Sequence, residues 1–244
     1  MAISHLTDRK ATCMYNNFAR FYDRLYHFKN YFSECNRLRE FIELYNSNAK
    51  TLLDVACGTA KHLELLQEHY QVEGVDISDD QLEIARSRCP GVLFHHGDMV
   101  DFNLGRTFDV VTCLFSSIAF VKTFENLNLA VATMVRHLKP DGLLFLEPYF
   151  GPDNYWVGRL TANFTDQADL KGAWMYISER DGLVGIQDNH FLVGTTKDIS
   201  YFTERHELGL FTPEQYQEAL RRVVFDVEYD NKGLCGRGMY IGKK

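Results

Sequence analysis

The chain has 244 residues, a formal net charge of −7 and a hydrophobic fraction of 45%, with 14% aromatic residues. That length fits one domain, or one domain with an embedded lobe, and the hydrophobic fraction is ample for a core. The negative charge disfavours nucleic acid and anionic membranes as partners, and no apolar run of about 18 residues predicts a membrane span.

The first half of the chain predicts a helix–strand rhythm. Two helices are expected at 15–26 and 31–45, the second with an apolar face. A buried strand around Asp54 stops at Cys57-Gly58, and a helix-compatible run follows at 61–69. A second apolar run, 72–75, leads into Asp76; a helix with an acidic first turn starts at Asp79, and 92–95 is a short strand.

The second half continues this rhythm and then leaves it. Residues 108–114 are almost wholly apolar, as expected of a parallel strand covered on both faces. A helix is expected at 124–138, then a turn at Pro140-Asp-Gly and a strand at 143–146. From 155 to 206, alternation and aromatic residues predict an antiparallel lobe inserted after the fifth strand. A helix starts near Pro213, and strands at 223–229 and 238–242 close the chain.

The stretch 51–60 is a strand, a small-residue turn and a helix, which together form a nucleotide-binding half-unit. Asp76 follows Gly58 by eighteen residues, about the interval at which an acidic residue grips ribose hydroxyls in dinucleotide-binding folds. The loop nevertheless lacks a full G-x-G-x-x-G, and Asp54 would repel a pyrophosphate. A ligand with an ammonium group nearby suits Asp54 better, which disfavours a nicotinamide-dependent oxidoreductase.

These residues carry a family resemblance. Asp54-Val-Ala-Cys-Gly-Thr, Glu73-Gly-Val-Asp-Ile-Ser, His96-Gly-Asp-Met and Leu138-Lys-Pro-Asp-Gly-Leu resemble successive motifs of the Rossmann-like methyltransferases that use S-adenosylmethionine (SAM). Further stretches, including Cys113-Leu-Phe-Ser-Ser-Ile, Glu147-Pro-Tyr-Phe and Gly236-Arg-Gly, resemble N,N-dimethyltransferases of macrolide biosynthesis, which act on nucleotide-linked amino sugars. This likeness covers the chain from about Tyr15 to its end.

The resemblance implies one methyltransferase domain, with cover helices at 15–48, a SAM-binding core at 51–150 and 207–244, and the inserted lobe at 151–206. It implies that Asp76 takes the ribose hydroxyls, that Asp98 meets the adenine amino group and that Met99 lies against the ring. The cofactor-binding residues it implies are Tyr22, Lys29, Ala56, Gly58, Asp76, Ile77, Asp98, Met99 and Phe115.

The same likeness implies an arginine at Arg237 that meets a substrate diphosphate, a task suited to a guanidinium fork. The substrate-binding residues it implies are Tyr15, Ser117, Phe120, Tyr149, Arg180, His206 and Arg237. Phe120 departs from the family, which often has His or Tyr there. Methyl transfer needs mainly alignment and a lone pair, so we place Tyr15, Phe120 and Glu147 in the catalytic region. Proton removal then falls to water, to Tyr15 or Tyr149, or to Glu147.

The sequence thus predicts a SAM-dependent methyltransferase acting on the amine of a small polar metabolite, most similar to those acting on nucleotide-linked amino sugars. The alternatives are another small-molecule N- or O-methyltransferase and a non-catalytic SAM-binding module. The resemblance suggests a homodimer. No metal is expected, because no His/Cys/Asp cluster has ligand spacing. Six cysteines without a C-x-x-C pair, and a start without a signal-peptide pattern, predict a cytoplasmic protein.

Overall fold

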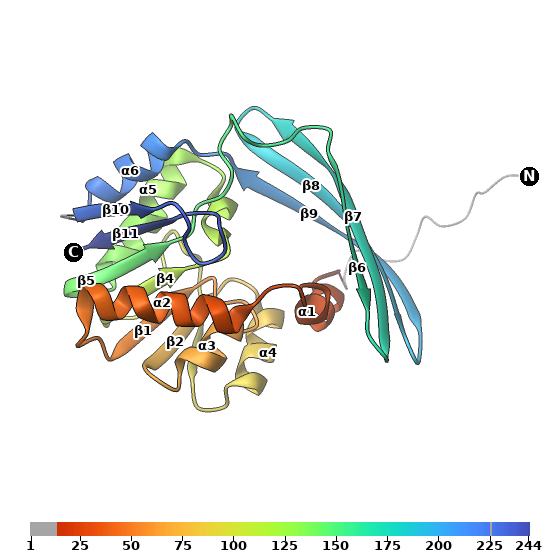
Figure 1. Cartoon of the computed structure of the whole chain (residues 1–244), viewed down its shortest axis with the longest axis horizontal. Coiled ribbons are helices and arrows are strands. Elements are labelled where there is room, and N and C mark those ends of the chain that lie inside the picture. The colour runs from red at the N-terminus through yellow and green to blue at the C-terminus, as the bar shows by residue number, and fades with distance from the viewer. Residues whose placement is uncertain (1–13, 225) are drawn as a thin grey trace, which may run out of the picture.

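The computed structural model describes residues 14–224 and 226–244. Over these residues the chain forms a seven-stranded sheet in the order β10-β11-β5-β4-β1-β2-β3 and a separate four-stranded sheet in the order β6-β7-β8-β9 (Figure 1). The helices are α1 Met14–Leu25, α2 Tyr31–Asn46, α3 Lys61–Leu66, α4 Asp79–Arg88, the 3₁₀ helix η1 Ser117–Val121, α5 Phe124–Arg136 and α6 Pro213–Arg221. The strands are β1 Thr51–Val55, β2 Gln71–Asp76, β3 Leu93–His96, β4 Phe108–Cys113, β5 Leu138–Leu146, β6 Leu160–Asp166, β7 Leu170–Asp181, β8 Val184–Thr195, β9 Ile199–Gly209, β10 Asp226–Asp230 and β11 Met239–Lys243.

The large sheet is a Rossmann-like sheet, as predicted. Strands β1 to β5 pair in parallel, and β11 enters antiparallel between β5 and β10. The strand order reverses between β1 and β4. Ligands of such sheets bind beyond the carboxyl ends of the strands at this reversal, so the topology itself marks the region after β1, β2 and β4.

Helices cover both faces of this sheet. Side chains of α5 and α6 pack with Val111 and Cys113 of β4 in one apolar cluster, and α2, α3 and α4 pack with Val110 in another. Because successive residues of a strand point to opposite faces, this double burial explains why β4 is mostly apolar. The prediction of a strand covered on both faces is confirmed.

The starts of α6 and β5 can be compared with the positions predicted from the sequence. Thr212 and Gln215 form a capping box at the start of α6, with Pro213 in the first turn, so the predicted helix start is confirmed. Strand β5 starts at Leu138, five residues before the expected position. At the predicted turn, 140–142, the pairing of β5 with β4 is irregular, and Asp141 has a φ of 61°. The backbone of Lys244 forms hydrogen bonds with Asp141 and Gly142 there.

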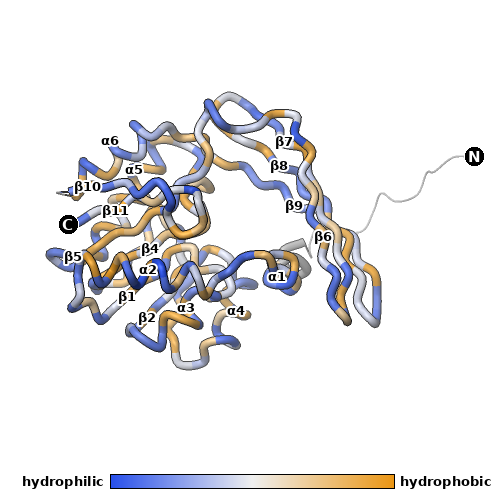
Figure 2. The backbone as a smooth tube through the Cα atoms, in the orientation of Figure 1, coloured by the Kyte–Doolittle hydropathy of each residue, from blue (hydrophilic) through white to orange (hydrophobic). Residues whose placement is uncertain are grey.

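The second sheet, inserted between β5 and α6, is antiparallel throughout, as predicted. Its strands alternate between hydrophilic and hydrophobic residues (Figure 2). On the inner face, Trp174, Phe191 and Phe202 pack against Phe21 and Leu25 of α1. Helix α1 therefore lies between the two sheets (Figure 1).

Side chains of helix α1 bond to segments next to both sheets. Asp23 accepts a hydrogen bond from the Thr59 hydroxyl at 2.7 Å and pairs with Arg88, which fixes the helix to the large sheet's loops. On the other side, Arg24 donates to Gln167 and Asp169 in the turn between β6 and β7. No helix among the described residues is long and apolar enough to cross a membrane.

Candidate functional site

A cavity of about 790 Å³ lies between the carboxyl ends of the parallel strands and the inner face of the second sheet. Its other walls come from α1 and the segment after it. A volume of this size is ordinary for a small-molecule site. The predicted site residues that line it are Tyr22, Ala56, Gly58, Asp76, Ile77, Met99, Phe115, Ser117, Phe120, Tyr149, His206 and Arg237.

The loop after β1 forms one edge of the cavity. Ala56, Gly58 and Ala60 all have positive φ, at 57°, 54° and 63°. Such a conformation costs L-residues of the order of 1 kcal/mol and is usual for glycine alone. The loop is held because the Gly58 amide donates to the Asp76 carboxylate at 2.8 Å and the Cys57 amide donates to the Val75 carbonyl at 3.1 Å. These bonds hold Ala56 and Gly58 at the cavity wall, where a ligand can approach their backbone.

Asp76 is buried beside this loop. Its Oδ1 accepts from the Ser78 amide at 2.9 Å and its Oδ2 from the Gly58 amide. Burial raises the pKa of Asp76, while the amides of Ser78 and Gly58 oppose that shift. Each carboxylate oxygen keeps a further lone pair for a vicinal diol. The side chain of Gln81, whose Oε1 is buried without a partner among the described residues, and the exposed Ile77 line the same end. This end fits the ribose and base of a nucleoside.

A smaller cavity of about 50 Å³ adjoins the same loop and is lined by Asp54, Lys29 and Tyr31 among others. Asp54 is buried and accepts from the Thr112 hydroxyl at 2.7 Å, and burial raises its pKa to about 6. A bound ammonium group would stabilise its charged form. The Lys29 ammonium lies 4.2 Å from the Phe115 ring centre and pairs with Glu34. This region can therefore meet both charges of an amino-acid group.

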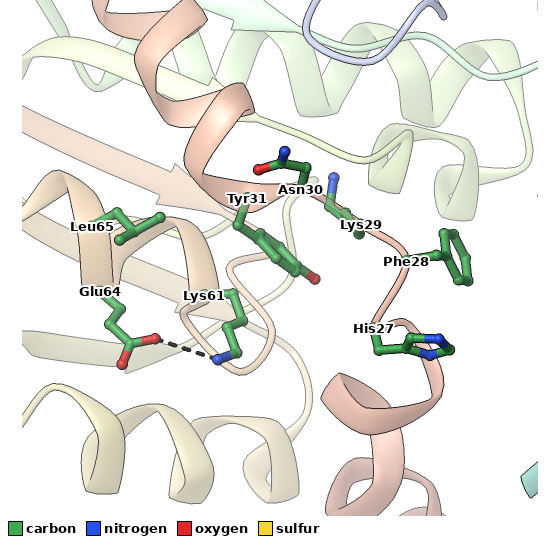
Figure 3. Close-up of a pocket in the computed structure, with 8 residues that line it drawn as sticks. All are labelled: His27, Phe28, Lys29, Asn30, Tyr31, Lys61, Glu64 and Leu65. Carbon is green, nitrogen blue, oxygen red and sulfur yellow. Dashed lines mark hydrogen bonds and ion pairs between the residues drawn. The ribbon is translucent and has the colours of Figure 1, made fainter. Parts of the chain in front are cut away.

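An opening of about 500 Å³ lies on the outer side of Lys29 and Tyr31. Figure 3 shows the residues around it: His27 to Asn30 come from the connection between α1 and α2, Tyr31 from the start of α2, and Lys61, Glu64 and Leu65 from α3. Lys61 and Glu64 are joined at 3.5 Å. Lys29 thus lines this opening and the small cavity, and is absent from the lining of the central one.

The turn after β4 has a backbone conformation that was not predicted from the sequence. Phe115 and Ser116 both have positive φ, at 53° and 60°. Glu147, 0% exposed, accepts from the Phe115 amide at 2.6 Å through Oε2 and from the Cys235 thiol at 2.9 Å through Oε1. Both oxygens are engaged below the cavity floor. We therefore correct the expectation that Glu147 takes a proton from the substrate: in this structure it positions Phe115.

Arg237 reaches this turn from the loop before β11. Its guanidinium lies 5.0 Å from the centre of the Phe115 ring and donates to the Ser116 hydroxyl at 3.3 Å. Tyr149 accepts from the Gln187 amide at 2.9 Å, and burial raises the pKa of its hydroxyl, which keeps that hydroxyl protonated. The Phe120 ring, 48% exposed, meets the His206 ring edge-on at 5.4 Å.

Three other predicted residues fall outside the central cavity or the described side chains. Arg180 donates to the carbonyls of Gly182 and Pro152, at 2.6 and 2.9 Å, beyond the cavity lining. Asp98 caps its own turn by accepting from the Val100 amide at 3.1 Å, and only its neighbour Met99 lines the cavity. The side chain of Tyr15 lies outside the described part. Within that part, no group of three or more His, Cys, Asp or Glu could hold a metal ion.

Sequence reasoning missed several wall residues on the second sheet. Trp174 and Glu204 line the cavity, and each has a buried polar atom without a hydrogen-bond partner among the described residues, Nε1 and Oε2. Strand alternation offered a signal for Glu204, because residues two apart on β9 share a face and His206 was already a candidate.

Comparisons with known proteins agree with this geometry. Residues 52–142 match the family described as "Methyltransferase domain". The chain is 38% identical over 216 residues to the dTDP-3-amino-3,6-dideoxy-alpha-D-glucopyranose N,N-dimethyltransferase of Streptomyces fradiae, covering 88% of this chain and 85% of that protein. The structure of Streptomyces venezuelae DesVI superposes with a TM-score of 0.85 at 32% identity, over 96% of this chain and 98% of that one.

A third relative was solved with the cofactor. SAM-bound CalS10, an amino pentose methyltransferase from Micromonospora echinaspora, has a TM-score of 0.82 and 33% identity, over 97% and 99% of the two chains. The Asp76 end of the cavity fits the nucleoside of the same cofactor, because the Asp76 carboxylate offers acceptors and the backbone of the loop after β1 lines the cavity. The chain therefore belongs to the SAM-dependent methyltransferases, in the family that includes the Streptomyces fradiae N,N-dimethyltransferase.

Proposed function

We propose that the protein methylates the amine of a nucleotide-linked amino sugar. The observation that carries the proposal is a single cavity that joins the Asp76 loop to Arg237 and to the polar residues of the second sheet. One end suits a nucleoside, and the other offers a guanidinium for a diphosphate. The Streptomyces fradiae relative is named as an N,N-dimethyltransferase of a dTDP-linked amino sugar and CalS10 as an amino pentose methyltransferase, which supports the same substrate class here.

We assign the residues as follows. Asp76, Gly58, Ile77 and Met99 hold the nucleoside of SAM, and Asp54 with Lys29 meets its amino-acid end. When bound, SAM supplies an electrophilic methyl group on a positively charged sulfur. Arg237 binds the substrate's diphosphate, and Ser117, Phe120, Tyr149 and His206 surround the sugar. Asp98 and Arg180 are left out of this assignment, because neither lines the cavity.

Phe115, Tyr22 and Tyr26 form an apolar wall between the two ends of the cavity. The rings of Tyr26 and Phe115 meet edge-on at 5.8 Å, and those of Tyr22 and Tyr26 lie 4.7 Å apart. Such a wall excludes water and fixes the approach of an amine to the methyl group, which is the main requirement of the transfer.

The test is methyl transfer to nucleotide-linked amino sugars, free amino sugars, glycine and simple phenols, read by mass. We expect gains of one and then two methyl units on an amino sugar nucleotide. Efficient turnover of a phosphate-free compound would instead assign a general small-molecule N- or O-methyltransferase. Tight SAM binding with no turnover on the panel would assign a non-catalytic module.

We also propose that the protein is a homodimer through the outer face of the second sheet. The register of β6 to β9 puts large apolar side chains on that face, including Phe164 at 70% and Ile177 at 54% exposed. Contiguous exposed apolar surface of this kind marks interaction sites. The other members are Leu160, Met175, Leu192, Ile199 and Tyr201.

Ile177→Asp should dissociate this dimer, because it puts a carboxylate among the apolar side chains of that face. Light scattering should change from twice the chain mass of 28.3 kDa to that mass itself. A wild-type protein that already has the mass of one chain at tens of micromolar would contradict the proposal.

We propose the cytoplasm as its compartment. Cys113 and Cys57 are buried free thiols, and burial raises the pKa of both well above the ordinary value. Thiols packed in the core of the SAM-binding sheet suit a reducing environment. Fractionation of cells that make the protein is the direct check.

A further inference from the structure

One carboxylate on the cavity wall lacks the partners that its neighbours have. Three acidic residues line the central cavity in the described part of the chain: Asp76, Glu204 and Glu207. Asp76 accepts two backbone amides, and Glu207 pairs with Lys122 at 2.8 Å and Arg205 at 3.1 Å. Glu204 is different, because its Oε2 is buried with no hydrogen-bond partner among the described residues.

One oxygen of the Glu204 carboxylate has a partner, and the other has none among the described residues. On its own strand, His206 Nε2 lies 3.4 Å from its Oε1. Tyr26, which follows α1, interacts electrostatically with Glu204, with Tyr176 of β7 and with Arg237 before β11, and all four line the central cavity. Burial, and then the Glu204 carboxylate, raise the pKa of Tyr26, so that phenol keeps its proton. A buried, unsatisfied carboxylate oxygen is costly unless a ligand supplies a donor or a proton.

Glu204 lies on the inner face of the second sheet, which lines the cavity. Alternation along β9 puts Phe202, Glu204 and His206 on the inner face, and their register partners on β8 are Phe191, Asn189 and Gln187. Glu204 therefore lies where an aromatic row gives way to a polar one. Tyr26 contacts both Trp174 on the sheet and Phe115 on the floor, at ring separations of 5.7 and 5.8 Å.

We infer that Glu204, held by His206, binds the ammonium group of the substrate and takes its proton before each methyl transfer. The inference rests on the proposed function and adds the group that handles the proton. Glu147 is sealed below the floor, and Tyr149 and Tyr26 stay protonated. Among the described residues that line the cavity, Glu204 is the remaining carboxylate with an unpartnered oxygen.

The proton balance of the reaction requires such a group. The lone pair of nitrogen forms the new N–C bond, the C–S bond breaks with its electron pair going to sulfur, and one proton leaves nitrogen for each methyl added. An ammonium ion has no lone pair, so the proton must leave before the N–C bond forms. Glu204 accepts it and returns it to solvent between turnovers. A positioned carboxylate in this role contributes about 10²- to 10⁴-fold.

The test uses Glu204→Gln, which keeps the shape and removes the charge. The first readout is calorimetric binding of an amino sugar nucleotide and of its hydroxyl analogue to protein saturated with S-adenosylhomocysteine. We expect amine affinity to fall about 10- to 100-fold, from loss of a charged hydrogen bond, while affinity for the hydroxyl analogue is unchanged. Glu43→Gln, the same change at an exposed position on α2, should match the wild type in both.

The second readout is the pH profile. In Glu204→Gln, kcat/KM should fall about 100-fold or more at neutral pH. It should then rise about tenfold per pH unit up to the pKa of the free substrate ammonium, because only substrate that is already neutral can react. Glu204→Asp, which retains the charge one methylene further back, should keep the preference for the amine. Circular dichroism and SAM affinity show that each variant is folded.

The outcomes separate the two proposals. An active wild type with a Glu204→Gln variant that keeps the amine preference and the wild-type pH profile would overturn the inference alone. A wild type that binds SAM but methylates no amino sugar nucleotide would overturn the proposed function, and this inference with it.

Discussion

Asp76→Ala should weaken SAM binding by roughly one to two powers of ten, because a charged hydrogen bond of about 1.5–3 kcal/mol is lost. The structure adds a second reason. The Asp76 carboxylate also holds the Gly58 amide at 2.8 Å, so its removal releases the loop that brings the backbone to the ligand. Isothermal calorimetry with SAM measures the effect directly.

Asp79→Ala is the matched control. Asp79 is an exposed carboxylate three residues further on, in the first turn of α4, and it does not line the cavity. Its loss should cost a few tenths of a kcal/mol of helix stability and leave SAM affinity unchanged. Unchanged affinity in Asp76→Ala, or tight binding of NADH by the wild type, would refute the cofactor site.

Arg237→Ala should lower kcat/KM for an amino sugar nucleotide, since a partly desolvated guanidinium–phosphate contact is lost. The expected loss of transition-state stabilisation is about 2–4 kcal/mol. SAM affinity should stay the same, because Arg237 contacts the Phe115–Ser116 turn after β4, while Asp76 ends β2, two strands away from β4. Free amino sugars should be far worse substrates than their nucleotide-linked forms. Steady-state kinetics on both classes measures the difference.

Two further variants sharpen this result. Arg237→Lys keeps the charge without the planar fork and should lie between wild type and alanine. Arg222→Ala removes an exposed arginine paired with Glu218 on α6 and should change nothing. If phosphate-free compounds turn over well and Arg237→Ala has no effect on them, the diphosphate assignment is wrong.

The sequence predicts the parts of this molecule that depend on nearby residues. The apolar run of β4, the eighteen-residue step from Gly58 to Asp76 and the Pro213 helix start are all local patterns, and the structure confirms each element. The antiparallel second sheet was also foreseen, because alternation of polar and apolar residues is a property of each strand alone.

Roles that depend on distant segments could not be predicted. Glu147 follows β5, but its two partners are Phe115 after β4 and Cys235 before β11, so its burial is visible only after folding. Glu204 reads as an ordinary charge in an alternating strand, and its unpaired oxygen exists only because the sheet faces the cavity. Lys29 was expected beside the cofactor, and its pairing with Glu34 depends on how α1 joins α2.

The most direct measurement is a crystal structure of the protein with S-adenosylhomocysteine and an amino sugar nucleotide bound together. The account predicts the ribose hydroxyls on Asp76, the diphosphate on Arg237, and the amine directed at the sulfur within reach of Glu204. Adenosine without contact to Asp76, or a sugar whose amine points away from the sulfur, would contradict it.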